Sequence, residues 1–296
     1  MEKSQIEVFK KLIFETVSNS CSGSDTVGVA LSSGIDSNLL MFSLLEAGKK
    51  VRAYSFHREG VQSSDYVLAK RNAEKLGVSF TEVVVPTELD MGKLKHLMTT
   101  HNLKSKTAIE CTYTMSFVWE AMGRDGVDIA YAGISMDSHF CHSKTASIHY
   151  KETLALNQEY RRMKFDHYDF ETTGIWGLGA QASAWVGTAK ENGVELILPA
   201  ARKSVYDFFY TKTWYELNEP TQKHPLWECY PEYVQKLDLR KHTNLQCGDS
   251  MIRELFEPML ESKLNKKSRK RIMDLYRDLH EEYNSKKSSL SKFIVE

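Results

Sequence analysis

The sequence predicts an α/β fold, with a parallel sheet in the first half of the chain and a helix-rich second half. Three short runs of β-branched and apolar residues, at 26–31, 51–56 and 79–85, alternate with segments whose apolar residues recur at helical spacing. Strands that alternate with helices in this way form a parallel sheet with helices on its faces. Residues 128–132 (DIAYA) predict a further strand of the same sheet.

The predicted helices divide the sequence into two parts. Helical spacing of apolar residues is found, in order, over 4–19, 39–45, 65–76, 90–102, 113–124, 148–166 and 176–192. The last two lie in a part of the sequence with few strand signals. We therefore expect a core over 1–145 and, over 146–296, a helix-rich part that completes the site and carries a basic helix near its end.

The composition is that of an ordinary globular protein, and it excludes several classes. Lys and Arg number 39, as do Asp and Glu, so the protein has no overall field that would recruit nucleic acid or a membrane. No apolar run approaches the ~18 residues of a membrane span, and the N-terminus lacks a signal-peptide pattern, so we expect a cytoplasmic location and no membrane partner. The five cysteines contain no CxxC pair, which favours reduced thiols over disulfides or a zinc site.

A phosphate-binding loop is predicted directly after the first strand. Ser32, Ser33 and Gly34 form a small polar turn, and an apolar helical run follows. The first N–H groups of a helix are unpaired and carry the positive end of its dipole, and small residues let an anion approach the main chain. The hydroxyls of Ser32 and Ser37 add donors, and Asp36 is able to hold a magnesium ion beside a polyphosphate.

Two further places lie at the carboxyl ends of predicted strands, where parallel sheets bind ligands. Ser55, Phe56 and His57 end the second strand, and Gly133 and Asp137 follow the fourth. A carboxylate at position 137 faces the same crevice as the phosphate loop, and two carboxylates around a polyphosphate make a magnesium site. The alternative is that Asp137 only caps the next helix.

Several charged or titratable residues admit two interpretations. Glu195 lies in an apolar ELIL stretch and is either edge-exposed or functional, because burying a carboxylate without a partner is costly. Lys223 is a loop lysine, and most loop lysines are solvated. The basic cluster at 263–271 favours a solvated helix face over a nucleic-acid contact, since no aromatic residues interleave it. His139 and His142 are expected in the substrate pocket or at the surface, not in a zinc site.

These segments resemble those of a known family. Residues 32–37 (SSGIDS) resemble the SGGxDS pyrophosphate loop of the PP-loop ATP pyrophosphatase (adenine nucleotide α-hydrolase-like) superfamily, with Ser33 in place of the first glycine. Residues 132–138 (AGISMDS) resemble the Ser-Gly-x-Gly-x-Asp-Glu pattern of its asparagine synthetase-like branch, and residues 193–199 (GVELILP) resemble the Gly-x-Glu-x-Arg-x-Pro segment of that branch. The departures from these two patterns include Ser135, Ser138 and Ile197.

The resemblance implies a chemistry and a set of site residues. The superfamily loop grips the β and γ phosphates of ATP, which is split into AMP and pyrophosphate. By resemblance, Asp36 and Asp137 share magnesium, the adenine lies against the main chain of residues 55–57, Lys223 reaches the phosphates, and Glu195 is a further site residue. Residues 239–249 resemble a basic segment near the family's site, which makes Arg240 and Lys241 candidates for meeting phosphate.

The predicted function is an ATP-dependent ligase that uses ATP and Mg²⁺. It adenylates a carboxylate, or an amide or ring oxygen, for attack by ammonia or another amine. The protein has Glu2 where complete asparagine synthetases carry the cysteine of a glutaminase domain, so ammonia is expected from solution or from a separate glutaminase subunit. Ile134 replaces the acidic residue or tyrosine of the branch, which leaves the general base and the nucleophile open. The alternatives are a PP-loop enzyme that modifies a nucleobase or its precursor, and a nucleotide-binding subunit without catalysis.

Overall fold

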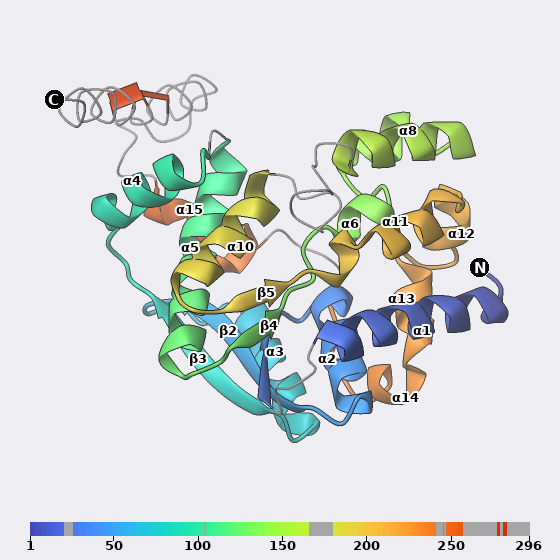
Figure 1. The fold of residues 1–296 in the computed structure, drawn as a ribbon, viewed down its shortest axis with the longest axis horizontal. Coiled ribbons are helices and arrows are strands. Elements are labelled where there is room, and N and C mark those ends of the chain that lie inside the picture. The colour runs from blue at the N-terminus through green and yellow to red at the C-terminus, as the bar shows by residue number, and fades with distance from the viewer. Residues whose placement is uncertain are drawn as a thin grey trace, which may run out of the picture.

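Five parallel strands form the centre of the computed structural model, in the order β3-β2-β1-β4-β5 (Figure 1). They are β1 (Thr26–Ala30), β2 (Lys50–Arg58), β3 (Ser79–Val85), β4 (Ile129–Tyr131) and β5 (Glu195–Ile197). The register pairs Val29 of β1 with Ala53 of β2 on one side and with Tyr131 of β4 on the other. The strand order reverses between β1 and β4, so their carboxyl ends form the switch point of the sheet.

The α/β fold class, with its parallel sheet and helix-rich second half, is confirmed. β3 has its predicted bounds, and β2 continues past its predicted end to Arg58. β5 was not predicted, because a strand of three residues beside Gly193 has too short a pattern to detect. Since β5 comes from the second half of the sequence, the sheet draws on both predicted parts.

The structure describes residues 1–20, 26–103, 105–165, 180–240, 245, 247–256, 277–278 and 281–282. Its longer helices are α1 (Lys3–Ser20), α2 (Ile35–Glu46), α3 (Ser64–Lys75), α4 (Met91–Thr100), α5 (Lys106–Arg124), α8 (Leu154–Phe165), α10 (Ala180–Glu191) and α11 (Lys203–Tyr210). Shorter helices are α6 (Met136–His139), α7 (Lys144–His149), α12 (Trp214–Asn218), α13 (His224–Cys229), α14 (Pro231–Val234) and α15 (Ile252–Leu255), with 3-10 turns at Pro199–Ala201 and Gly248–Ser250.

Helices cover both faces of the sheet. On one face, α1, α2 and α3 belong to a core that buries Phe9 and Leu39 with Val29 of β1. On the other face, α5 and α10 lie side by side (Figure 1) and bury Trp119 with Ala130 of β4. Because both faces of the sheet are covered, the central strands need apolar residues at successive positions, as in the TVGVA sequence of β1.

Two of the predicted helices differ from the helices in the structure. α5 begins earlier than predicted, because the Ser105 hydroxyl accepts a hydrogen bond from the N–H of Ala108 at 3.3 Å and caps it. The helix predicted over 148–166 is instead two helices, α7 and α8. The Thr153 hydroxyl accepts from the N–H of Leu156 at 3.3 Å and starts the second of them. Polar caps therefore set boundaries that apolar periodicity alone does not show.

Some predictions fall outside the described residues. These are the basic cluster at 263–271, Lys241, and the start of the helix predicted over 176–192. Within the part of the protein that the structure describes, no helix has the length and apolar character needed to cross a membrane. The cysteines in that part are free thiols, namely Cys111, Cys141, Cys229 and Cys247.

Candidate functional site

A cavity of about 710 Å³ lies at the carboxyl ends of β1, β2 and β4, at the switch point of the sheet. Its lining comes from the loops after β1 and β4, from α5 and α10, and from residues within 221–227, 239–240, 245 and 247–250. The sequence-predicted residues that line it are Ser32, Ser33, Gly34, Asp36, Ser37, Phe56, Gly133, Asp137 and Lys223. Segments far apart in the sequence are therefore brought together as the site prediction requires.

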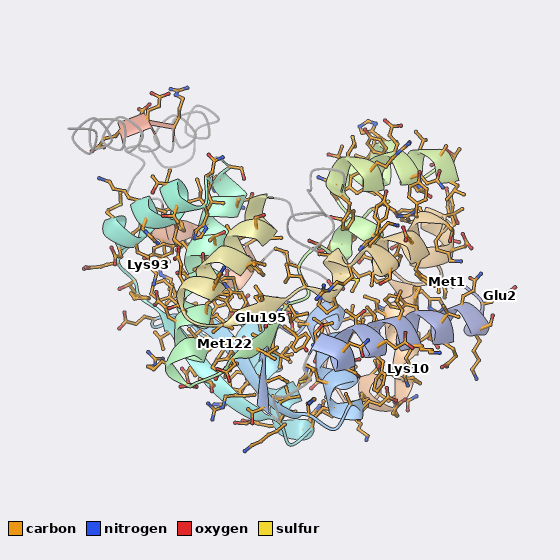
Figure 2. The ribbon with its side chains drawn as sticks, viewed as in Figure 1. Met1, Glu2, Lys10, Lys93, Met122 and Glu195 are labelled. Atoms are coloured by element: carbon orange, nitrogen blue, oxygen red, sulfur yellow. The ribbon has the colours of Figure 1, made fainter. Side chains whose placement is uncertain are left out.

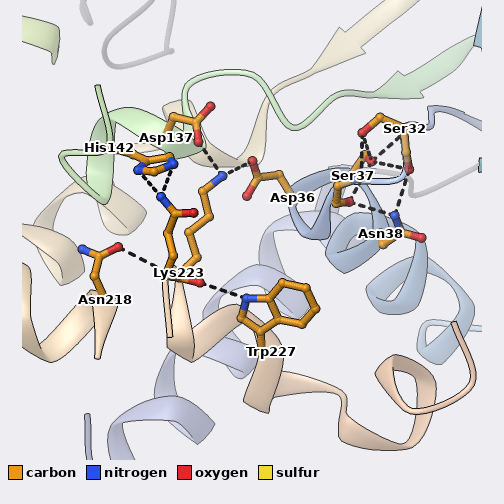
Figure 3. A network of polar contacts seen from close by, with 11 residues as sticks. Ser32, Asp36, Ser37, Asn38, Asp137, His142, Asn218, Lys223 and Trp227 are labelled. Carbon is orange, nitrogen blue, oxygen red and sulfur yellow. Dashed lines mark hydrogen bonds and ion pairs between the residues drawn. The ribbon is translucent and has the colours of Figure 1, made fainter. Parts of the chain in front are cut away.

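The loop after β1 is held in shape by its own side chains (Figure 3). The Ser32 N–H donates to the Ser37 Oγ at 3.0 Å, and the Gly34 N–H donates to the Ser32 Oγ at 3.2 Å. The Asn38 Nδ2 donates to the carbonyls of Ser32 and Gly34, at 2.9 and 2.8 Å. Gly34 is the N-cap of α2, and α2 begins without a side-chain cap. A helix that starts in this way presents the positive end of its dipole to an anion.

Ser33 stands where the superfamily loop has glycine, and it is tied to α3. Its N–H and its hydroxyl both donate to Oδ1 of Asp65, at 2.9 and 2.5 Å. Its carbonyl accepts from the N–H of Arg240 at 3.0 Å. Arg240, a candidate from the resemblance, thus lies at the loop and lines the cavity. Asp65 was not predicted as a site residue, because a carboxylate in the first turn of a helix is typical of an ordinary helix start.

Gly133 lets the loop after β4 approach the start of α2. A Cβ on Gly133 would lie 3.1 Å from both the carbonyl carbon and the Cβ of Asp36, and 3.2 Å from the amide nitrogen of Ser37. Ser135, which replaces the second glycine of the motif, has a φ of 75°, in the left-handed region that favours glycine. Ser135 therefore adopts a backbone conformation that glycine favours, at the position where the motif has glycine. Asp137 follows in the first turn of α6, which has no side-chain cap.

The ammonium group of Lys223 joins the two carboxylates that were predicted to bind metal. Its Nζ forms ion pairs with Oδ2 of Asp36 and Oδ1 of Asp137 (Figure 3). Lys223 is only 3% exposed. Burial lowers its pKa, but the charges of Asp36 and Asp137 outweigh burial and hold the pKa above its ordinary value. Lys223 is therefore charged, and the two carboxylates share its one positive charge.

The same geometry tests whether the site suits magnesium. Carboxylate oxygens from two separate loops converge on one cation, and Mg²⁺ prefers hard oxygen ligands of this kind. Proteins usually hold Mg²⁺ through one or two carboxylates, with water and substrate phosphates as the other ligands. The described residues contain no group of three or more His, Cys, Asp and Glu that could hold a metal. Asp36 and Asp137 therefore fit magnesium as a pair that works together with phosphate.

An apolar part of the cavity contains the predicted residue Phe56, and its other residues were not predicted. Its lining includes Tyr54 and Phe56 of β2, Met115 of α5, Ile134, and Trp185 of α10. The positions of α5 that line the cavity, 107, 111, 115 and 118, recur at helical spacing. That spacing is visible in the sequence, but it does not distinguish a core-facing stripe from a cavity-facing one. The flat apolar surfaces suit a ring system.

Three predicted site residues do not line this cavity. Ser55 and His57 alternate with Phe56 along β2, so their side chains face the other side of the sheet, where Nε2 of His57 lies 2.5 Å from Oε1 of Glu82. The main chain of residues 55–57 lies beyond the last residue of β2 that pairs with β1. The expected contact of this main chain with adenine stays a prediction. Glu195 is exposed at the start of edge strand β5 (Figure 2), in a separate groove. Of the two interpretations of Glu195, edge-exposed or functional, the structure supports the first.

The two histidines after Asp137 have different surroundings. His139 is fully buried between two phenylalanine rings, at 4.3 and 4.7 Å between ring centroids, and its Nε2–H donates to the carbonyl of Ala200 at 2.7 Å. Burial lowers the pKa of His139 to about 3, so the ring is neutral and belongs to the core. His142 instead contacts the side chain of Gln222, next to Lys223 (Figure 3).

Comparison with known proteins found one family that the first half of the sequence matches. Residues 8–153 match the family described as asparagine synthase. This range contains both the phosphate loop and the Asp137 loop, which carry the resemblance to the asparagine synthetase-like branch. No curated protein matches this one.

Solved structures give a more distant likeness. The protein is similar to U34-tRNA thiolase NcsA from Methanococcus maripaludis, solved with its 4Fe-4S cluster, at 14% identity and a TM-score of 0.43 over 94% of this protein and 79% of that one. It is also similar to a predicted subunit of tRNA methyltransferase from Methanocaldococcus jannaschii, at 14% identity and a TM-score of 0.32 over 73% of this protein and 93% of that one.

Proposed function

We propose that this protein is an AMP- and pyrophosphate-forming ligase. The premise is that residues 8–153 are an asparagine synthase-type domain of the PP-loop superfamily. In this proposal an oxygen of an organic acceptor, a carboxylate in the first instance, is adenylated by ATP. Ammonia or another amine, from solution or from a separate glutaminase subunit, then displaces AMP and forms a carbon–nitrogen bond.

One observation carries the proposal. The uncapped start of α2, two carboxylates from different loops and a buried lysine meet in one cavity at the switch point of the sheet. A site for a neutral ligand has no need of this concentration of charge, because each buried charge costs free energy unless it is paired. A polyphosphate supplies the negative charge that the helix start and Lys223 are suited to bind.

In the first step the acceptor oxygen forms a bond to the α phosphorus of ATP. The bond from that phosphorus to the oxygen bridging to the β phosphate breaks, and pyrophosphate leaves with the electron pair. The loop and the start of α2 hold the tail in line for this displacement. The ammonium of Lys223 stabilises the negative charge that grows on the leaving pyrophosphate, and this contribution is largest in the transition state.

Asp36 and Asp137 are the residues that would hold magnesium. Magnesium bound there neutralises phosphate charge and orients the polyphosphate. The carboxylates of Asp36 and Asp137 also position the Lys223 ammonium, since both accept from it.

In the second step the amine attacks the adenylated carbon. AMP leaves with the electrons of the carbon–oxygen bond, and the amine loses a proton. Ile134, half-buried beside Trp185 in the apolar cluster, stands where the related enzymes carry an acidic residue or tyrosine, and a hydrocarbon side chain takes up no proton. The amine therefore has to arrive as its free base, and the rate should rise with pH up to the pKa of that amine.

Exchange of labelled pyrophosphate into ATP tests the proposal. We expect exchange that depends on one acceptor in a panel of carboxylic acids, nucleobases and nucleosides. Asp36→Asn should abolish exchange, whereas Asp128→Asn, an exposed carboxylate outside the cavity, should leave it unchanged. Undiminished exchange by the Asp36→Asn variant would refute the role of the loop. Absence of exchange with every acceptor would favour a nucleotide-binding subunit without catalysis.

A second candidate function uses the same first step on a different acceptor. The aromatic side chains of Tyr54, Phe56 and Trp185 in the cavity favour an acceptor with a flat ring, such as a nucleobase or its precursor whose ring oxygen is adenylated. The exchange panel separates the two candidates directly. Dependence on an aliphatic acid supports the ligase, and dependence on a nucleobase or nucleoside supports the modification enzyme.

A further inference from the structure

We infer that Asp65 is a positioning residue of the phosphate loop, and that its task is tied to the presence of serine at position 33. The inference rests on the proposed function, because it takes the loop as the binding site for the ATP tail. Asp65 does not touch substrate in this account. It acts through Ser33.

The contacts of Ser33 show how it is held. Oδ1 of Asp65 accepts from both the N–H and the hydroxyl of Ser33, and the N–H of Arg240 donates to its carbonyl. Every polar group of Ser33 is thus bonded to a residue from another segment. Ser33 is only 1% exposed, so water does not take the place of these partners. The position of the loop is therefore fixed from α3 on one side and from the segment at 239–240 on the other.

A glycine at position 33 would keep the N–H that donates to Asp65 but would lose the hydroxyl, so it would depend less on this carboxylate. Glycine has no hydroxyl, whereas a buried serine hydroxyl without a partner is destabilising. Asp65 lies in the first turn of α3, where the helix dipole favours a carboxylate, and α3 is itself capped by Ser63, whose side chain accepts from the N–H of Tyr66 at 3.2 Å. The backbone that carries Asp65 is therefore held by a cap that does not involve the loop.

The bond to Asp65 also decides which groups remain for phosphate. The N–H of Ser33 points at a carboxylate, so it is withdrawn from the donors that an anion in the cavity can use. The polyphosphate must then be held by the start of α2 and by Lys223. If Asp65 is lost, the hydroxyl of Ser33 has to find another partner, and the loop shifts with it.

The test is the affinity for Mg·ATP, measured by calorimetry, of Asp65→Ala, Ser33→Gly and the double variant. We expect Asp65→Ala to weaken binding by about 10-fold or more, because a small misplacement of a binding group is costly. Ser33→Gly should bind within about 3-fold of the wild type. Asp65→Ala should cost less affinity in the Ser33→Gly background than in the wild type, because only the N–H of residue 33 then loses its partner. A role in general folding would not be rescued by removing a hydroxyl from the loop.

The control is Asp238→Ala. The Asp238 carboxylate also contacts α3, because it accepts a hydrogen bond from Lys75 Nζ at 2.9 Å, but it lies outside the cavity. It should bind Mg·ATP like the wild type. The inference is overturned if Asp65→Ala binds like the wild type, or if Ser33→Gly does not rescue it. If Asp65→Ala alone fails to fold, the affinity of the double variant for Mg·ATP is still compared with that of Ser33→Gly. Failure of the wild type to bind Mg·ATP would instead refute the proposed function.

Discussion

Replacing Gly133 by alanine should weaken ATP binding by pushing on the start of α2. The new Cβ would lie 3.1 Å from the carbonyl carbon and Cβ of Asp36 and 3.2 Å from the amide nitrogen of Ser37, closer than the 3.4 Å at which ordinary contact begins. The loop and the helix start must therefore separate by a few tenths of an ångström. Overpacking of this kind costs ~1–3 kcal/mol, partly offset by ~0.4–1 kcal/mol from the lower entropy of the unfolded state.

The displaced atoms belong to the phosphate site, so binding suffers as well as folding. We expect Gly133→Ala to lower the affinity for Mg·ATP by about 10-fold, equivalent to ~1.4 kcal/mol. The matched control is Gly28→Ala, whose Cβ would lie 2.9 Å from Cγ1 of Val127 and 3.2 Å from Sδ of Met122, between the sheet and α5. Urea unfolding should show that both variants are destabilised, whereas calorimetry should show a loss of affinity for Gly133→Ala alone. Equal affinities in the two variants would refute this reasoning.

Two further predictions concern buried charge. Lys223→Met leaves Asp36 and Asp137 facing each other, so the free energy of unfolding should fall by up to ~3 kcal/mol. In the absence of nucleotide, Mn²⁺ should bind about 10-fold more tightly to this variant, as measured by electron paramagnetic resonance. The control Lys203→Met, at an exposed lysine, should change neither the free energy of unfolding nor the Mn²⁺ affinity. Unchanged Mn²⁺ affinity in Lys223→Met would contradict the account. Burial lowers the pKa of His139 to about 3, so between about pH 6.5 and 3 the imidazole takes up a proton only in the unfolded state. The free energy of unfolding should therefore fall as the pH drops through that window, by ~2 kcal/mol at pH 5. His139→Phe should lose this part of the pH dependence in unfolding experiments, and the same pH dependence in both proteins would refute the assignment.

The fold was largely predictable because its main elements have strong local patterns. The run at 26–31 and the run at 79–85 are strands, and their alternation with helices indicated the parallel sheet. β5 escaped because its place in the sheet depends on pairing with β4, not on its own three residues. Likewise, the break between α7 and α8 depends on the cap at Thr153, a single hydroxyl within a helical pattern.

The site was predictable where a motif fixes the backbone and not where only tertiary contact decides. Gly133 and Asp137 lie at the phosphate loop, as their position after the fourth predicted strand implied. Asp65 belongs to the site through a hydrogen bond to a serine that replaces glycine, and no local pattern marks such a partner. Glu195 is the converse case, since its segment resembles the family motif but its side chain is exposed on the edge strand.

The central claim is that ATP bound at this loop is cleaved next to the α phosphorus. The most direct measurement is ³¹P NMR of the products formed from ATP and Mg²⁺ in the presence of the acceptor that supports exchange. The account predicts AMP and pyrophosphate in equal amounts. The appearance of ADP and inorganic phosphate instead would contradict it.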